Sequence, residues 1–319
     1  MGIQFSVVIP TFNAGAFVRR TLESIHSQDY KSFEVIIVDD HSTDDTLELV
    51  RLSGHPKQIL TNPGKGVGAA RNHGASIARG DYLCFLDADD IWFPWVLSNF
   101  AKCIESNENP PWVIGKSIPF TADIELDNPT RLTLHAAEHP VTFVYSNFLS
   151  TYRKYMEIHT GTHAIRRDVF TQCGGYDEHL GNLEDGDIYL KLSEVGPMVL
   201  IERPVLLGYR QREDSVSKLR KGQLDDCMTV YNRARSGFYA STSRSARQQS
   251  YVASRYLRPV LVDLARTGSR GIFLRYWLGI LRTEIFLGHF KFVLGSLAVS
   301  MVTLWKGKFK SLSREGVIA

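Results

Sequence analysis

Cysteine is scarce in this chain and never occurs at a metal-binding spacing. The 319 residues include four cysteines, none of them in a Cys-x-x-Cys pair, which argues against cysteine-based zinc sites and thioredoxin-like redox motifs. Cys84 lies inside an apolar run, where a reduced thiol packs as a small apolar side chain. We therefore expect a protein of a reducing, cytoplasmic setting.

The signals of several common protein classes are also missing. The first residues, MGIQFSVVIPTF, have neither a basic region nor a cleavage pattern, so we expect no secretory signal. The glycine-rich segment 64–68 fits neither GxGxxG nor GxxxxGKS/T, which argues against a dinucleotide-binding or P-loop site. The acidic segment 39–45 lacks the glycine and the terminal glutamate of a calcium loop. What remains is an ordinary globular composition, with 44% hydrophobic residues.

Basic charge is concentrated towards the C-terminal end. Residues 251–319 carry eleven basic and three acidic residues, a balance of +8, so the first 250 residues sum to −5 in a chain of net charge +3. This asymmetry favours an anionic surface as partner. Phospholipid fits better than nucleic acid, because no nucleic-acid motif accompanies the charge.

Segment Phe292–Trp305 holds 14 residues without charge, whereas a helix that spans a membrane needs about 20. Two interpretations remain. The segment packs on the rest of the protein or in a dimer, or it lies in the interfacial plane at the inner face of the membrane. The basic residues that follow it favour the second, a peripheral membrane contact. The oligomeric state is not set by the sequence.

Apolar strands and amphipathic helices alternate over the first hundred residues. We expect strands at residues 5–9, 33–38, 58–60 and 81–86, with helical patterns between them. The helix after the glycine loop is rich in alanine and glycine, so it can lie close against a sheet. Strands separated by helices of this length predict right-handed crossovers and an α/β, Rossmann-like fold, whose mostly parallel sheet has helices on both faces.

The rest of the chain is less regular. A helix is expected over 94–107 and strands over 112–115, 160–165, 199–203 and 205–209, with a helix that opens at 182–186. Residues 116–158 have little periodicity and are interpreted as a variable insertion. From about residue 219 the pattern is helical to the end, which predicts a helical C-terminal extension.

Polar side chains follow four of the expected strands. Pro10–Asn13, Asp39–Asp40, the glycine loop and Asp87–Asp90 all stand at carboxyl ends of strands, which is where parallel sheets place their ligands. Carboxylates packed together after a buried strand repel one another, and a Mg²⁺ or Mn²⁺ ion relieves that repulsion. Taken alone, both aspartate clusters also fit plain turns that cap the next helix.

The ordered motifs resemble one family. The strings FSVVIPTFNAGAFVRRTLESIHSQDYKSFEVIIVDDHSTDDT, GVGAARNHGASIARGDYLCFLDADD and AIRRDVFTQCGGYDEHLGNLEDGDIYLKL closely resemble the family 2 inverting glycosyltransferases of the GT-A fold. The resemblance covers residues 5–218. It implies a catalytic domain over 1–218, with a nucleotide-binding half (1–115) and an acceptor half (116–218), followed by the helical region 219–319.

The resemblance implies roles for residues at the matching positions. The nucleotide donor would contact Pro10, Thr11, Phe12, Asp39, Asp40, Arg71 and Asp87, with Asp40 on the uracil imide and the aromatic ring near the base. Asp87 and Asp89 match the outer carboxylates of the DxD motif, which holds a divalent cation, Mn²⁺ or Mg²⁺. Asp89 is the direct ligand, and Asp87 takes the ribose or a metal-bound water.

Glu184 and Asp185 resemble the family's ED motif and are the expected catalytic residues. Asp185 is favoured as the general base, although a helix N-terminus favours its ionised form and keeps its basicity modest. Arg212 stands where the family often has a histidine. Because an arginine clamps phosphate oxygens but ligates no metal, we expect Arg212, or Arg210, on the diphosphate.

The sequence therefore predicts a metal-dependent enzyme. It would move a hexose from a nucleotide-diphosphate donor, a UDP-sugar, to a hydroxyl of a glycan or lipid-linked acceptor by direct displacement. The alternative is a non-catalytic relative that binds a nucleotide-sugar or glycan, but such a protein needs no base. Nucleic acid is not an expected partner.

Overall fold

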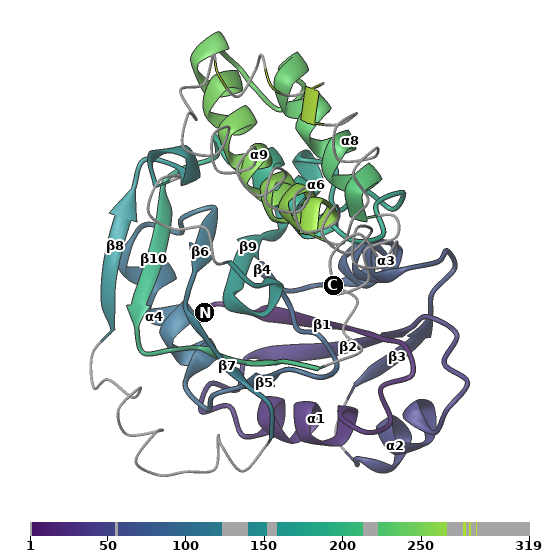
Figure 1. Cartoon of the computed structure of the whole chain (residues 1–319). Coiled ribbons are helices and arrows are strands. Elements are labelled where there is room, and N and C mark those ends of the chain that lie inside the picture. The colour runs from purple at the N-terminus through teal and green to yellow at the C-terminus, as the bar shows by residue number, and fades with distance from the viewer. Residues whose placement is uncertain are drawn as a thin grey trace, which may run out of the picture. The chain divides into compact units, whose positions relative to one another are not determined.

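An eight-stranded sheet organises the first of two compact units, Met1–Lys218 and Leu219–Ala319, in the computed structural model (Figure 1). The structure describes residues 2–54, 57–122, 140–151, 158–212 and 223–266, together with residues 277, 278, 281 and 285. The strands of this sheet are β1 (Phe5–Thr11), β2 (Phe33–Asp39), β3 (Gln58–Thr61), β4 (Tyr82–Phe85), β6 (Trp112–Ile114), β8 (Val141–Tyr145), β9 (His163–Arg166) and β10 (Met198–Arg203).

The order of these strands is β3-β2-β1-β4-β9-β6-β10-β8. Strands β3, β2, β1 and β4 run parallel, as do β6 and β10, whereas β9 and the edge strand β8 pair antiparallel with their neighbours. Strands β1, β2 and β4 run in the same direction and therefore end at the same edge of the sheet, where Thr11 of β1 lies opposite Asp39 of β2. The predicted mostly parallel sheet is confirmed.

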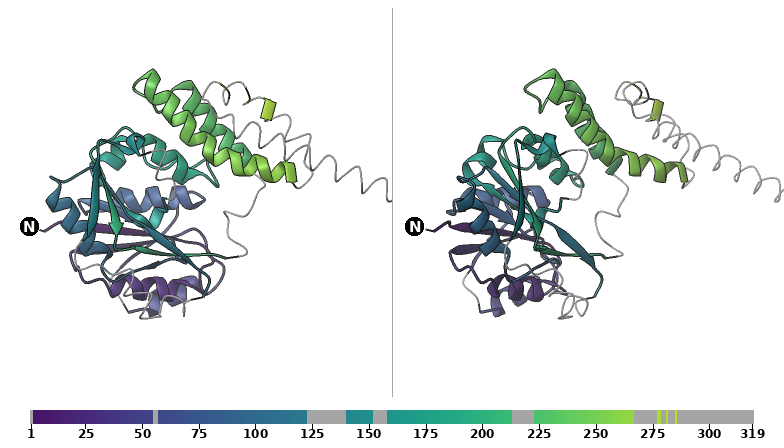
Figure 2. Two further views of the ribbon diagram at one scale, coloured as in Figure 1. Left: turned by 60° about the vertical axis from the view of Figure 1, so that its left-hand side comes forward. Right: turned by 90° about the vertical axis from the view of Figure 1, so that its left-hand side faces the viewer.

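Helices cover both faces of this sheet. They are α1 (Val18–His26), α2 (Thr46–Leu52), α3 (Val67–Ile77), α4 (Val96–Ser106), α6 (Arg167–Gln172) and α7 (Glu184–Lys191). Alternate residues of β1 pack with the apolar sides of α1, α2 and α4 in one core. On the other face, Gly74 of α3 lies against Val8, and Phe170 of α6 lies against Phe85. Figure 1 and the two views of Figure 2 show α1 and α3 on opposite sides of the strands.

A second, three-stranded sheet lies beside the end of β4. It contains β5 (Ile91–Trp92), β11 (Leu207–Arg210) and β7 (Ser117–Phe120), in the order β5-β11-β7. Because β5 directly follows the aspartate cluster, its pairing with β11 brings residues 210–212 back to that cluster.

Two parts of the chain differ from the sequence-based expectation. Residues 116–158, interpreted as an insertion, contain β7, β8 and a 3₁₀ turn at Phe148–Ser150. Strand β8 alternates poorly because it is an edge strand with exposed apolar residues on both faces. The expected strand 160–165 begins instead as a 3₁₀ turn, Thr160–Thr162, which the Thr162 N–H closes onto the carbonyl of His159 at 2.9 Å.

The described part of the second unit is helical, as predicted. Helices α8 (Gln223–Ser236) and α9 (Ser243–Arg266) pack against each other through buried residues such as Val230 and Leu257. The expected apolar segment Phe292–Trp305 lies outside the described residues. Within the described part of the chain, no helix combines the length and the apolar character needed to cross a bilayer.

The close approach of α3 to the sheet leads to a first prediction. A Cβ atom at Gly74 would overlap Val8 Cγ1 and lie 3.1 Å from Val38 Cγ2. We expect Gly74→Ala to lower the free energy of unfolding by about 1–3 kcal/mol, the usual cost of overpacking. Chemical denaturation measures the loss, with Ser76→Ala on the exposed side of the same helix as control. Equal stability of the two variants would contradict the packing described here.

Candidate active site

The two aspartates at the end of β2 have different surroundings. Asp39 is buried and accepts hydrogen bonds from Thr11 Oγ1 at 3.2 Å and from the Ser42 N–H at 3.1 Å. Asp39 therefore stabilises the turn after β2, as the interpretation of Asp39–Asp40 as a plain turn predicts. Asp40 instead accepts from Asn62 Nδ2 at 2.7 Å and from the Gly66 N–H at 2.9 Å. These bonds tie the glycine loop, and with it the start of α3, to the end of β2.

An exposed aromatic ring stands beside these aspartates. Phe12 directly follows β1, and 62% of the residue is exposed, although Pro10 and Thr11 just before it are buried in the strand. A positive φ of 47° at Asn13 turns the chain away after it. An exposed ring at the carboxyl edge of a parallel sheet can stack on a planar ligand.

A buried arginine connects the aspartate cluster with the ED motif. Arg71 of α3 is 2% exposed; its Nη2 donates to Asp87 Oδ1 at 2.7 Å, and its Nη1 donates to Glu184 Oε1 at 2.8 Å. The ring centroid of Tyr176 lies 5.1 Å from the guanidinium carbon. Burial lowers the pKa of Arg71, but the charge of Asp87, followed by Tyr176 and Glu184, keeps it well above its usual range. The Arg71 bridge thus fixes Asp87 relative to Glu184.

The aspartates of the cluster Asp87–Asp90 differ in exposure and in their hydrogen-bond partners. The side chains of Asp87 and Asp89 are 36% and 28% exposed. Asp90 is buried; its carboxylate accepts from the Arg210 N–H at 2.8 Å, and its own N–H donates to the Asp87 carbonyl at 3.1 Å. Burial and the neighbouring Asp87 and Asp89 raise the pKa of Asp90 well above its usual range. Asp90 is thus a structural support of the turn, whereas the outer two carboxylates remain partly exposed.

Two arginines from the end of β11 surround Asp89. Arg212 Nη1 lies 3.0 Å from Asp89 Oδ2, and Arg210 Nε donates to the Asp89 carbonyl at 2.8 Å. Both guanidinium carbons lie 4.9 Å from the ring centroid of Phe17. The sequence analysis predicted that Arg212 or Arg210 contacts the diphosphate, but it did not predict a role for Phe17. The loop before α1 lies beside β11 only in the folded chain.

The outer carboxylates fit a divalent cation. Asp87 and Asp89 each use one oxygen in an arginine pair, and the second oxygen lies outside that pair. In the described residues no group of three or more His, Cys, Asp or Glu side chains forms a metal cage. Such a site suits an ion that completes its shell with water and phosphate oxygens, as Mg²⁺ commonly does.

Asp185, the predicted general base, has a strongly raised pKa. It lies in the first turn of α7 beside Glu184, and its Oδ1 accepts from the Gly186 N–H at 2.6 Å. Burial, followed by the charge of Glu184, raises the pKa of Asp185 to about 7, against the opposing charge of Arg71. The expectation of modest basicity was wrong, because burial outweighs the helix N-terminus.

Neutral aromatic residues lie beneath the Arg71 bridge. His163 of β9 is fully buried against Phe85, Trp112 and Tyr189. Burial and the charge of Arg71 lower the pKa of His163 to about 3. The imidazole is therefore neutral near pH 7 and adds no second positive charge beside Arg71.

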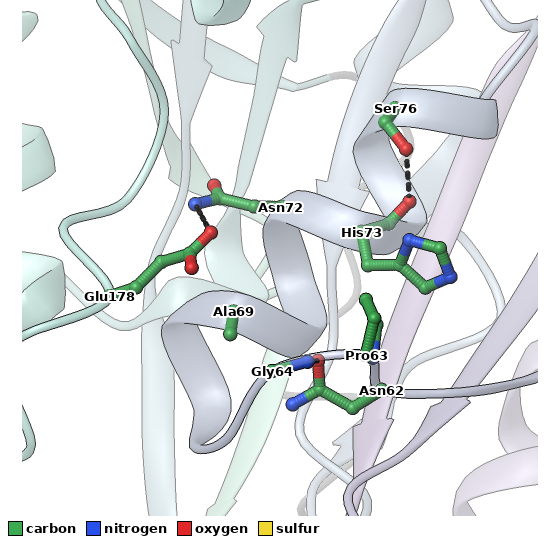
Figure 3. Close-up of a pocket in the computed structure, with 8 residues that line it drawn as sticks. All are labelled: Asn62, Pro63, Gly64, Ala69, Asn72, His73, Ser76 and Glu178. Carbon is green, nitrogen blue, oxygen red and sulfur yellow. Dashed lines mark hydrogen bonds between the residues drawn. The ribbon is translucent and has the colours of Figure 1, made fainter.

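A pocket of about 280 Å³ opens on the outer side of α3. Figure 3 shows Glu178 reaching Asn72 from a separate segment, with His73 opposite and residues 62–64 below. Asn62 lines this pocket and also donates to Asp40, so the pocket adjoins the end of β2.

The sequence matches the family model described as Glycosyl transferase family 2 over residues 6–174. The chain belongs to this family. The predictions of a family 2 glycosyltransferase and of a GT-A fold are confirmed.

Named relatives agree with this assignment. The glycosyltransferase is 44% identical over 213 residues to the amylovoran biosynthesis glycosyltransferase AmsB of Erwinia amylovora, covering 64% of this chain and 68% of AmsB. It is 38% identical over 105 residues to WfaP of Escherichia coli, described as UDP-Glc:alpha-D-GlcNAc-diphosphoundecaprenol beta-1,3-glucosyltransferase, covering 32% of this chain and 42% of WfaP.

Two solved structures share the fold. TarS 1-349 of S. aureus, in complex with UDP-GlcNAc, has a TM-score of 0.64 at 18% identity, covering 83% of this chain and 81% of TarS 1-349. The mannosyltransferase PcManGT of Pyrobaculum calidifontis, in complex with GDP-Man and Mn²⁺, has a TM-score of 0.54 at 17% identity, covering 96% and 88%. At these identities the likeness concerns the fold.

The raised pKa of Asp185 makes stability depend on pH. The folded glycosyltransferase keeps a proton on Asp185 up to about pH 7, whereas the unfolded chain releases it near 3.8. The free energy of unfolding therefore falls as pH rises between these values. Asp185→Asn removes this fall, so its melting temperature relative to the unchanged protein should rise from pH 4.5 to pH 7.5.

Asp168→Asn is the matched control with the opposite sign. A hydrogen bond from Arg166 lowers the pKa of Asp168, so that carboxylate stabilises the fold above its unfolded pKa and loses the effect in acid. Its variant should be slightly less stable than the unchanged protein at pH 7.5. A pH-independent difference for Asp185→Asn would contradict the raised pKa.

Proposed function

We propose that this glycosyltransferase moves a hexosyl group from a UDP-sugar to a hydroxyl of a glycan or lipid-linked acceptor, with inversion at the anomeric carbon. The observation that carries this proposal is the Arg71 bridge. It holds Asp87 of the aspartate cluster at 2.7 Å and Glu184, next to Asp185, at 2.8 Å. Groups suited to a leaving diphosphate and to an entering hydroxyl thus flank one guanidinium.

The donor's base would lie at the ends of β1 and β2. Asp40 keeps acceptor capacity on its carboxylate for an imide N–H beyond the bonds from Asn62 and Gly66. Phe12 presents an exposed ring for stacking, and Thr11 and Asp39 hold the strand ends around it. A uridine donor is supported by the name of WfaP and by the UDP-GlcNAc complex of TarS.

The diphosphate would lie over Asp87 and Asp89, with residues 1–115 forming the donor half. These carboxylates would hold Mn²⁺ or Mg²⁺, which when bound supplies positive charge against the charge of the departing diphosphate. The Mn²⁺ in the PcManGT complex supports this choice. Arg212 and Arg210 add guanidinium groups on the same side of the site.

Asp185 would be the general base of the displacement. The acceptor hydroxyl gives its proton to the Asp185 carboxylate as its oxygen forms a bond to the anomeric carbon, while the bond from that carbon to the diphosphate oxygen breaks. A pKa of about 7 matches a base that works near neutral pH. Glu184, held by Arg71, keeps this turn of the helix in place.

The names of two relatives support the proposed acceptor. AmsB is named for amylovoran biosynthesis, and the name of WfaP gives a diphosphoundecaprenol-linked acceptor. These names support polysaccharide synthesis with residues 116–218 as the acceptor half. A lipid-linked acceptor also agrees with a peripheral contact of the basic region 251–319 at the cytoplasmic face of the membrane.

The test is the pH dependence of donor turnover with Mn²⁺, in the unchanged protein and in Asp185→Asn. We expect log(kcat/KM) to rise with slope one up to about pH 7 and then to level, since the ionised base is required. Asp185→Asn should lose a factor of roughly 10²–10⁴, the usual contribution of a general base, whereas the surface variant Asp168→Asn should keep full activity. Equal, near-zero turnover in the unchanged protein and Asp185→Asn, across a panel of UDP- and GDP-sugars, would favour a binding protein.

A further inference from the structure

Arg212 pairs with one oxygen of the carboxylate that the proposed cation needs. Its Nη1 lies 3.0 Å from Asp89 Oδ2, with side-chain exposures of 24% and 28% for the two residues. This is a partly buried pair, which solvent screens less than a surface pair. The charge of the Asp89 carboxylate is therefore balanced by a cation of the chain itself.

The position of Arg212 is supported by more than this ion pair. Its guanidinium lies over the Phe17 ring at 4.9 Å, and Arg210 shares that ring at the same distance. Arg210 is fixed more firmly, since it is buried, donates through Nε to the Asp89 carbonyl and through its N–H to Asp90, and lies 4.4 Å from Phe120. Arg212 is paired with the partly exposed carboxylate of Asp89, and a ligand that reaches this carboxylate can replace the pair.

A cation that approaches Asp89 alone meets this positive charge. It must displace the guanidinium from Oδ2 or share the carboxylate with it, and both are unfavourable for like charges a few ångströms apart. A nucleotide diphosphate offers Arg212 another partner, because phosphate oxygens accept the paired N–H bonds of a guanidinium as well as a carboxylate does.

We propose that Arg212 holds the place of the metal ion on Asp89 in the donor-free enzyme and moves to the diphosphate when the donor arrives. The metal ion then binds appreciably only together with a nucleotide diphosphate. This inference rests on the proposed function through the assignment of Asp89 as metal ligand. It gives Arg212 opposite effects on two equilibria: it weakens binding of the metal ion alone and strengthens binding of the nucleotide with metal.

The experiment titrates the whole protein with Mn²⁺ alone, followed by electron paramagnetic resonance of the free ion. It then titrates with UDP at saturating Mn²⁺ by calorimetry. We expect Arg212→Met to bind Mn²⁺ alone at least about tenfold more tightly than the unchanged protein, since the repelling charge is gone. The same variant should bind UDP with Mn²⁺ at least about tenfold more weakly, since the arginine–phosphate contact is lost.

Two further variants complete the comparison. Arg212→Lys keeps the charge and should keep the weak binding of Mn²⁺ alone. Arg166→Met removes the arginine of the surface pair with Asp168, at 2.7 Å, and should change neither equilibrium. Circular dichroism melting confirms that each variant folds.

Asp89→Asn separates failure of this inference from failure of the proposed function. If Asp89→Asn abolishes the Mn²⁺ dependence of UDP binding while Arg212→Met leaves affinity for Mn²⁺ alone unchanged, the role of Arg212 is wrong and the metal assignment stands. If Asp89→Asn leaves that dependence intact, the metal assignment itself fails, and the role of Arg212 fails with it.

Discussion

The buried guanidinium of Arg71 is the interaction on which the rest of the site depends. It joins α3 to a strand end 16 residues later and to a helix start 113 residues later. A charge that is 2% exposed must be paired, and removing one partner of such a pair costs about 3–5 kcal/mol. The fold is therefore strongly constrained to keep Asp87 and Glu184 on either side of Arg71. The bond from Gly66 to Asp40, at the residue before α3, extends this constraint to the end of β2.

The carboxyl groups around the Arg71 bridge differ in how deeply they are buried. Asp90 lies in the protein and supports the turn, Asp87 and Asp89 face outward and pair with arginines, and Asp185 has a pKa of about 7. Four carboxyl groups with one chemistry thus have three kinds of surroundings, which set their charge and their partners. In the proposed function, the same division would put the donor and the acceptor on two sides of Arg71.

The sequence predicted most of the sheet and the positions of several site residues. Other features could not be predicted, because they depend on contacts between segments far apart in the chain. The buried strands, and the small residues of α3 such as Gly74, gave the sheet and the helix that lies on it, because their periodicity is local. The placement of Asp87 and Asp89 followed from the rule that ligands lie at strand ends. Strand β8, the bond from Arg210 to Asp90 and the shared ring of Phe17 depend on contacts between distant segments. The basicity of Asp185 was misjudged because burial is a property of the folded chain.

A double-mutant cycle on Arg71 and Glu184 tests the central claim most directly. The free energy of unfolding is measured at pH 8 for the unchanged protein, Arg71→Met, Glu184→Gln and the double variant. If the bridge holds the two sides of the site together, the coupling energy should reach about 1–3 kcal/mol, in the range of residues that share one ion-pair network. Additivity of the two single changes within about 0.5 kcal/mol would mean that Arg71 does not hold the site, and the account would be contradicted.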